Sequence, residues 1–197
     1  MAIQHERIAV PERGGRWSSE AEMVQAARVG DRAALEELVT LYKQPLFALC
    51  YGILGHVEDA EDAVQETFLR VFRSLPGFRG DASFRTWASR VAVNLCLDRK
   101  RSRRSFEPWD PEHPGSALST PSPESMALDH LQALHALQSL LPRHRALLLL
   151  KEREGWTVAE IAAALRCSPI RVKNELSQAR RFLVEWRRQQ RAEGEER

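Results

Sequence analysis

The chain has 197 residues, of which 43% are hydrophobic, and its 29 basic and 27 acidic residues give a net charge of +2. This length suits one domain or two small ones. No segment approaches the roughly 20 apolar residues that a membrane-spanning helix needs, and the charged first residues do not resemble a signal peptide. We therefore expect a cytoplasmic protein with ordinary hydrophobic cores.

The charges are segregated along the chain. Residues 18–75 contain 10 acidic and 5 basic residues, and residues 76–104 contain 2 acidic and 8 basic ones. Residues 105–130 contain 5 acidic residues and no basic one, and residues 131–197 contain 8 acidic and 13 basic ones. This alternation favours basic surfaces for nucleic acid and an acidic surface for a different partner.

The first part of the chain predicts four helices. Ser19 and Glu22 fit a capping box at the start of a short helix. Asp31 can cap a second helix, whose apolar face continues past Pro45 to Gly55.

A third helix is predicted over about residues 57–74, where apolar residues recur at steps of three and four. The sequence "LPG" ends it. A fourth helix is predicted from about residue 83, and its end is very basic, with five bases among the six residues 99–104. Nothing alternates with a period of two, so no strand is predicted.

A change of composition follows. Residues 105–125, "SFEPWDPEHPGSALSTPSPES", contain five prolines among serines and acids, which is typical of a flexible or extended linker. After it the pattern predicts four more helices, over about residues 123–141, 142–155, 157–165 and 168–191. Thr157 with Glu160 forms a capping box, and Ser168 followed by Pro169 is a typical helix start.

The predicted fold is therefore all-α, with two small helical domains joined by a flexible linker. We expect an N-terminal tail (1–17), a first domain (18–104), a linker (105–123), a second domain (124–191) and a C-terminal tail (192–197).

The last two predicted helices fit a helix-turn-helix, in which the second helix enters the major groove of DNA. Arginine suits guanine, asparagine suits adenine, and glutamate can accept a hydrogen bond from cytosine. The alternative is a plain helical hairpin with a solvated charged face. The candidate DNA-binding residues on the last helix are Arg171, Lys173, Asn174, Glu175, Ser177, Arg180 and Arg181.

The loop "PGFRGDASFRTW" and the helix after it combine aromatic rings with arginines. An unstacked base can stack on a ring or enter a loop pocket while arginine meets its phosphates. The alternative for the rings of Phe84 and Trp87 is a place in the core, and Asn94 could equally be an ordinary surface residue. The candidates here are Phe78, Arg79, Asp81, Phe84, Arg85, Trp87, Arg90, Asn94 and Arg101.

The polar face of the third helix is acidic and includes one leucine, Leu69. A solvated face is the ordinary interpretation of such a pattern. The sharper alternative is a basic protein partner, because duplex DNA would be repelled and an exposed leucine in a charged rim suits an interface.

Chemistry within the chain is not expected. Cys50, Cys96 and Cys167 are far apart and have no paired histidines nearby, so we expect buried, inert thiols and neither a disulfide nor a zinc site. There is no glycine-rich phosphate loop, HExxH or GxSxG motif. We predict no enzyme activity, no metal, no cofactor and no small-molecule substrate.

Two stretches resemble a known family. "DAEDAVQETFLRVFRSLPGFRGDASFRTWASRVAVNLCLDRKRSRR" closely resembles region 2 of the extracytoplasmic-function (ECF) group of bacterial RNA polymerase sigma factors. "LPRHRALLLLKEREGWTVAEIAAALRCSPIRVKNELSQARRFL" is similar to their region 4. The resemblance covers about residues 20–104 and 124–186. The chain departs from the family in the recognition helix, where Ile170, Arg171 and Val172 replace the usual Gly-Thr-Val.

The resemblance implies roles for the candidate residues. Region 2 would open the promoter at the −10 element, hold a flipped base in the loop with the help of Asn94, and follow the phosphates along the basic helix. Region 4 would read the −35 element as duplex, and a membrane-anchored anti-sigma factor would hold the chain at the inner face of the membrane. Core RNA polymerase would be bound by Asp62, Gln65, Glu66, Leu69 and Arg73.

The first hypothesis is thus a sigma factor that brings core RNA polymerase to promoter DNA. A second is a stand-alone helix-turn-helix regulator that binds duplex DNA as a dimer. A third is an interaction protein that only sequesters its partners.

Overall fold

The computed structural model describes residues 16–104 and 134–195, and all regular secondary structure in these two ranges is helical. This agrees with the all-α prediction. Most of the predicted N-terminal tail (1–17) and all of the predicted linker (105–123) lie outside the described residues, as does most of the helix predicted over residues 123–141.

The first domain contains four α-helices and one short 3₁₀ helix. They are α1 (Glu20–Arg28), α2 (Arg32–Leu54), α3 (Val57–Ser74), η1 (Leu75–Gly77) and α4 (Phe84–Arg104). The bounds of α3 match the predicted ones, and α2 continues through Pro45 as a single helix.

Local capping interactions set the starts of the first two helices. The Ser19 side chain accepts a hydrogen bond from the backbone N–H of Glu22, as a helix N-cap does. The Glu22 carboxylate, however, accepts from the N–H and hydroxyl of Ser18 and not from Ser19, so the predicted reciprocal capping box is wrong in this half. Asp31 caps α2 as predicted, and Gly55 ends it in a left-handed conformation with φ of +83°.

The core of this domain lies between α2, α3 and α4. The helices bury one apolar stripe each, as their sequence periodicity predicts. The largest fully buried side chains of this core are Met23, Leu38, Tyr42, Leu46, Leu49, Ile53, Val71, Leu75 and Phe84.

The second domain contains a short helix at residues 134–138, followed by α6 (Pro142–Leu148), η3 (Leu149–Arg153), α7 (Val158–Ala164) and α8 (Pro169–Glu195). The helix predicted over residues 142–155 is not uniform, because its second half, η3, is a π-helical turn. The capping box of Thr157 and Glu160 is present at the start of α7, as predicted.

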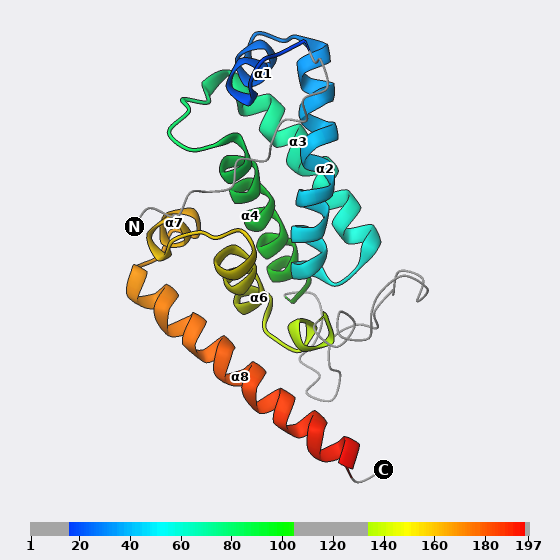
Figure 1. Ribbon diagram of the computed structural model, residues 1–197, viewed down its shortest axis with the longest axis vertical. Helices are drawn as coiled ribbons and strands as arrows, with labels where there is room; N and C mark the ends of the chain where they lie inside the picture. Colours follow the sequence, from blue (N-terminus) through cyan, green and yellow to red (C-terminus); the bar gives the residue numbers. More distant parts are fainter. Residues whose placement is uncertain (1–15, 105–133, 196–197) are drawn as a thin grey trace.

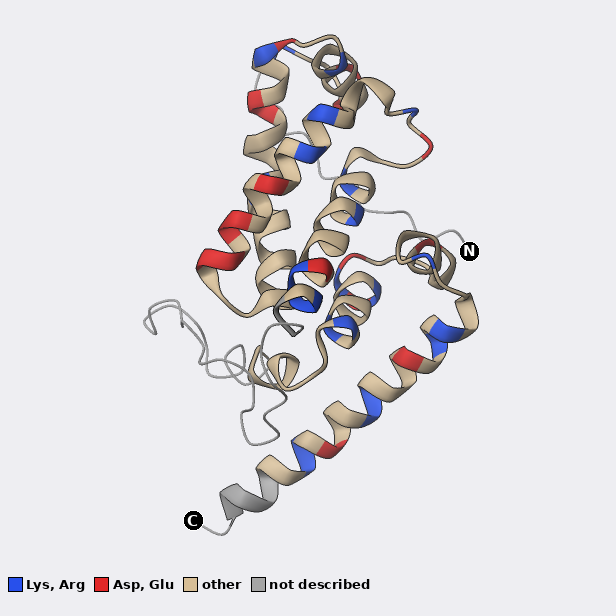
Figure 2. Ribbon diagram, turned by 180° about the vertical axis from the view of Figure 1, so that it is seen from behind, with Lys and Arg blue, Asp and Glu red and all other residues tan. Residues whose placement is uncertain are grey.

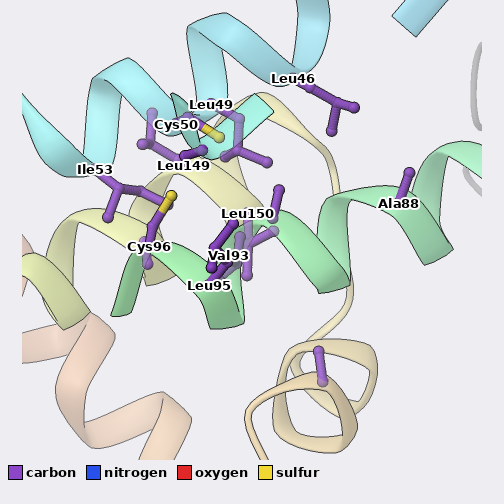
Figure 3. Packing of buried hydrophobic residues seen from close by; sticks show 14 of the residues in the cluster. Leu46, Leu49, Cys50, Ile53, Ala88, Val93, Leu95, Cys96, Leu149 and Leu150 are labelled. Carbon is purple, nitrogen blue, oxygen red and sulfur yellow. The ribbon is translucent and has the colours of Figure 1, made fainter. Parts of the chain in front are cut away.

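The two domains pack against each other (Figure 1). The four consecutive leucines Leu147 to Leu150 are all buried, and α6 contacts both the first domain, through α2 and α4, and α8. A Cβ placed on Gly52 of α2 would lie 2.7 Å from Leu149 Cδ1, which shows how closely the two segments approach. Figure 3 shows Leu149 and Leu150 among side chains of α2 and α4.

The cysteines agree only in part with the prediction. Cys50 and Cys96 are buried in the first domain, whereas Cys167 is half-buried, and its sulfur accepts a hydrogen bond from Arg143 at 3.4 Å. Within the described ranges no three metal-ligating side chains come together. No helix in them is long and apolar enough to cross a membrane.

Candidate functional site

The residues predicted for protein binding lie on one outer face of α3. Asp62, Gln65, Leu69 and Arg73 are exposed, and Glu66 is half-buried. Their spacing of three and four residues places them side by side on the helix. Figure 2 shows that acidic residues dominate the first half of α3. We call these five residues the α3 surface.

Leu69 distinguishes the α3 surface from an ordinary solvated face. Its side chain is 58% exposed, although the neighbouring Phe68 is buried in the core. The Glu66 carboxylate accepts a hydrogen bond from Arg70 Nε at 2.7 Å, which lowers the pKa of Glu66 below its usual range. An exposed leucine therefore lies within a charged rim, as protein interfaces often require.

The loop between η1 and α4 forms a hollow of about 450 Å³, which we call the loop pocket. The rings of Phe78 and Trp87 stack at its edge, with their centroids 4.7 Å apart. Arg90 lies at the same pocket, and its Nε is buried without a hydrogen-bond partner. The lining residues are Ser74, Gly77, Phe78, Arg79, Asp81, Ala82, Trp87 and Arg90.

Phe84 and Trp87 occupy different environments, although a place in the core was the alternative for both rings. Phe84 is 1% exposed and packs on the ring of Tyr42 at 5.1 Å, so it is a core residue and its ring is not available to a base. Trp87 is half-buried; its ring stacks with that of Phe78 and meets that of Phe84 in a T-shaped arrangement. The loop pocket thus includes Trp87 but not Phe84, whose ring packs against Trp87 from the core.

Two of the predicted DNA-binding residues on α4 contact the second domain. Arg85 Nε donates to one carboxylate oxygen of Glu154 at 3.1 Å, and Arg85 Nη2 lies 2.9 Å from the same oxygen in an ion pair. The Glu154 side chain is only 2% exposed. Asn94 Nδ2 donates to the backbone carbonyl of Ala164, at the end of α7, at 3.2 Å. Arg101 lies exposed beyond these contacts.

The helix-turn-helix prediction is borne out by α7 and α8. The side chains expected to pack the two helices together are Ile161, Ala162 and Leu165 against Val172 and Leu176; all of them are buried except Leu165, which is half-buried. The turn between them contains Arg166 at φ of +50°, a left-handed conformation that few side chains adopt. The Ser168 hydroxyl accepts from the N–H of Arg171 and caps α8.

Basic residues recur along α8 (Figure 2), and most of the predicted DNA-binding residues of this helix are exposed. Exposed among them are Arg171, Lys173, Asn174, Ser177, Arg180 and Arg181. Arg180 also pairs with Glu152 at 2.6 Å.

Glu175 is the exception, because its side chain is only 14% exposed. One carboxylate oxygen accepts from Arg171 Nε and the other from Arg143 Nε, each at 2.7 Å. Burial alone would raise the pKa of Glu175, but the hydrogen bonds from the two arginines outweigh it and lower the pKa. Glu175 is therefore ionised at neutral pH and already paired at both oxygens.

The sequence did not identify three residues that hold these surfaces together, namely Glu154, Arg143 and Ala164. Glu154 and Arg143 belong to charged stretches that resemble solvated surface, and Ala164 contributes only its backbone carbonyl. No periodicity or motif marks them, because each contact joins residues distant in the sequence.

Two family descriptions match the chain. Residues 38–106 match sigma-70 region 2, and residues 130–183 match sigma-70 region 4. The first match contains most of α2 with all of α3, the loop pocket and α4. The second contains α6, η3, α7 and the first half of α8.

Individual proteins are similar over most of the chain. The ECF RNA polymerase sigma factor SigM of Mycobacterium tuberculosis is 31% identical, over 87% of this chain and 86% of its own length. SigG of the same species, also an ECF RNA polymerase sigma factor, is 35% identical over 71% of this chain. That match covers only 45% of SigG, so the chain corresponds to less than half of this longer relative.

The fold is also similar to that of a solved sigma factor. RpoE of Bartonella quintana, crystallised with the anti-sigma factor NepR, is 23% identical to this chain, and the two folds superpose with a TM-score of 0.63. The match covers 76% of this chain and 94% of RpoE.

Proposed function

The chain belongs to the ECF group of RNA polymerase sigma factors, and we propose that it binds core RNA polymerase, recognises −35 and −10 promoter elements and opens the duplex there. The observation that supports this proposal is the presence on one chain of two exposed surfaces of different shape. The loop pocket suits an unpaired base, and the exposed side of α8 suits a major groove.

The α3 surface is proposed to bind the polymerase. Its acidic residues would repel DNA, but they would attract a basic protein surface. The exposed Leu69 can be desolvated there at the centre of a contact while Asp62, Glu66 and Arg73 form the polar rim.

The loop pocket is proposed to hold a base that has left the stack. Its volume of about 450 Å³ is within the range of small-molecule sites. A base can stack on the aromatic pair of Phe78 and Trp87, while Arg79 and the unpartnered Nε of Arg90 supply positive charge for the backbone. Asp81 can accept a hydrogen bond from the edge of the base.

The rest of α4 is proposed to follow the −10 strand, with contacts from Arg85, Asn94 and Arg101. Besides its bond to the Arg90 carbonyl within α4, Asn94 contacts the Ala164 carbonyl of the second domain, and Arg85 contacts Glu154 there. Both contacts must break before these side chains can reach DNA, so promoter binding requires the two domains to separate.

The connection between the domains is long enough for such a separation. Between the described ranges lie residues 105–133, and a chain of this length reaches up to about 95 Å when fully extended. Two sites separated by one turn of duplex DNA are only about 34 Å apart.

The second domain is proposed to read the −35 element as duplex through α8, with Arg171, Lys173, Asn174 and Ser177 near the bases. Arg180 and Arg181, further along the helix, would contact phosphates. No cofactor and no small-molecule substrate is required for any of these steps.

We also propose an anti-sigma factor as a partner. The similar fold of RpoE was solved with such a protein bound. A membrane-anchored anti-sigma factor would hold this chain, as a cytoplasmic protein, at the inner face of the membrane until a signal releases it.

Binding to core polymerase tests the proposal. Purified chain mixed with core enzyme should form a complex and start transcription at a subset of promoters. Replacing Asp62, Glu66 and Leu69 together by alanine should abolish the complex. The matched control replaces two acids and one exposed apolar residue elsewhere, Glu36, Glu37 and Val29, and should leave it intact. If the unaltered chain does not bind core enzyme, the proposal is wrong.

The same purified proteins distinguish this proposal from the stand-alone regulator. A regulator of that kind would bind one duplex site tightly without polymerase, and the α3 surface would serve no purpose. A protein that only sequesters partners would retain its activity when Arg90 or Arg171 is replaced.

A further inference from the structure

We propose that Glu175 is a positioning residue for −35 recognition, which holds Arg171 ready to read a guanine and does not itself contact a base. This inference rests on the proposed function and assigns one residue of the recognition helix a role that its position alone does not reveal. It is carried by the ion-pair network between α6, the turn after α7 and α8.

The network has a central acid and two arginines. Glu175 Oε1 accepts from Arg171 Nε and Glu175 Oε2 accepts from Arg143 Nε, both at 2.7 Å. Arg143, at the start of α6, also donates from Nη2 to the sulfur of Cys167 in the turn. One carboxylate thus connects the recognition helix to the domain behind it.

Burial separates the supporting residues from the exposed one. Glu175 and Arg143 have side chains 14% and 29% exposed, whereas Arg171 is 60% exposed. Arg171 lies in the first turn of α8, the part of a recognition helix that reaches base edges. The exposed arginine is therefore fixed from behind by a carboxylate that is itself fixed.

The geometry at Arg171 suits guanine. Glu175 takes only the Nε group, which leaves both Nη groups for a bidentate contact with O6 and N7. Holding the guanidinium in advance reduces the side-chain entropy that would otherwise be lost on binding. Arg171 is thereby organised before DNA arrives.

The competing role for Glu175, a hydrogen bond from cytosine, is disfavoured by the same contacts. To reach a base the carboxylate would have to leave both arginines. That movement would deprive the half-buried Arg143 of its only charged partner among the described residues, which is costly.

The test measures base preference position by position. Holoenzyme reconstituted with the full chain selects −35 sequences from a randomised duplex library, and transcription is then compared for each single-base change. The proteins compared are unaltered chain, Arg171→Ala, Glu175→Gln, the double variant and Arg143→Gln. The matched control is Glu185→Gln, the same substitution at an exposed site further along α8.

We expect the variants of the network to lose base preference at the same base pair of the −35 element. Arg171→Ala should lose about tenfold of the preference for guanine at one base pair. Glu175→Gln and Arg143→Gln should each weaken that same preference several-fold, and the double variant should be no worse than Arg171→Ala. Glu185→Gln should have the unaltered profile.

Three results would overturn the inference. Glu175→Gln could leave the guanine preference intact, or it could relax a different position that prefers cytosine. It could also lower transcription equally at every sequence, as a purely structural defect would. Arg143→Gln provides a second test of the network, and a thermal melt of each variant shows whether it is folded. If the unaltered holoenzyme selects no sequence at all, the proposed function fails, which is a separate outcome.

Discussion

On α4, Arg85 and Asn94 are bonded to Glu154 and to the Ala164 carbonyl of the second domain, whereas on α8 Arg171, Lys173 and Asn174 lie exposed. The recognition helix can therefore meet duplex DNA without rearrangement, but α4 cannot meet a single strand along its full length until the domains part. The two proposed DNA surfaces differ in accessibility more than in charge. This difference can be tested separately on each surface.

The largest expected effect is at the loop pocket. Trp87→Ala removes a stacking platform, and a base stacked on an aromatic ring contributes about 1–3 kcal/mol. Promoter opening by holoenzyme should therefore fall by about 5- to 150-fold. Run-off transcription measures this loss. On a promoter fragment with a pre-opened −10 region and no −35 element, Arg171→Ala should have no effect, and a loss there would contradict the separation of roles.

Weakening the contact between Arg85 and Glu154 should make α4 as accessible to DNA as α8. Glu154→Gln weakens a buried, charge-assisted pair, and hydrogen bonds to charged groups contribute about 1.5–3 kcal/mol. Free chain should then populate the separated state more often, and it should bind single-stranded −10 DNA up to about tenfold more tightly. Fluorescence anisotropy without polymerase measures the binding.

The matched control for this variant is Glu152→Gln, because Glu152 lies in the same turn but is exposed and pairs with Arg180 of its own domain. Energy transfer between dyes at Glu61 and Gln189 reports the separation of the domains directly. Unchanged transfer in Glu154→Gln would show that this pair does not hold them together.

A smaller, sequence-independent effect is expected further along α8. Arg181→Ala removes one proposed phosphate contact, so binding should weaken about equally for all −35 sequences. The slope of log affinity against log salt concentration should fall by about 1. A titration of holoenzyme binding at several salt concentrations measures this slope. A change confined to one base pair would instead make Arg181 a base-reading residue.

The smallest effect concerns stability and pH. The pKa of Glu175 is lowered in the folded chain, so its pairing stabilises the fold above the ordinary carboxyl pKa of about 4.3 and is lost as the pH falls through the folded value. Glu175→Gln should lower the melting temperature at pH 7 by about 2–4 °C. The gap between variant and unaltered chain should close under acid conditions. A gap that is constant with pH would assign the loss to packing and not to charge.

The sequence was sufficient for features that are encoded locally. The bounds of α3 followed from its apolar stripe and from "LPG", and Asp31 and the pair of Thr157 and Glu160 cap helices as predicted. The two helical parts and the helix-turn-helix followed in the same way. Each of these signals involves residues within one or two turns of each other.

The remaining features depend on contacts between distant residues. The sequence offered a place in the core for both Phe84 and Trp87, but it could not show that Tyr42 packs against the first while the second lies at a pocket. Nor could it show that four buried leucines lie between two domains, because an all-apolar helix only indicates burial on every side. The sequence also could not predict that the Glu22 carboxylate bonds to Ser18 and not to Ser19, since both serines are suitably placed.

Permanganate reactivity of thymines in the −10 region tests the central claim most directly. With core enzyme and unaltered chain together, these thymines should become reactive at promoters the holoenzyme transcribes, and with either component alone they should stay protected. The reactivity should be lost with Trp87→Ala. If the thymines stay protected with core enzyme and chain together, while the chain alone binds the promoter tightly, the chain acts as a duplex-binding regulator and the account is wrong.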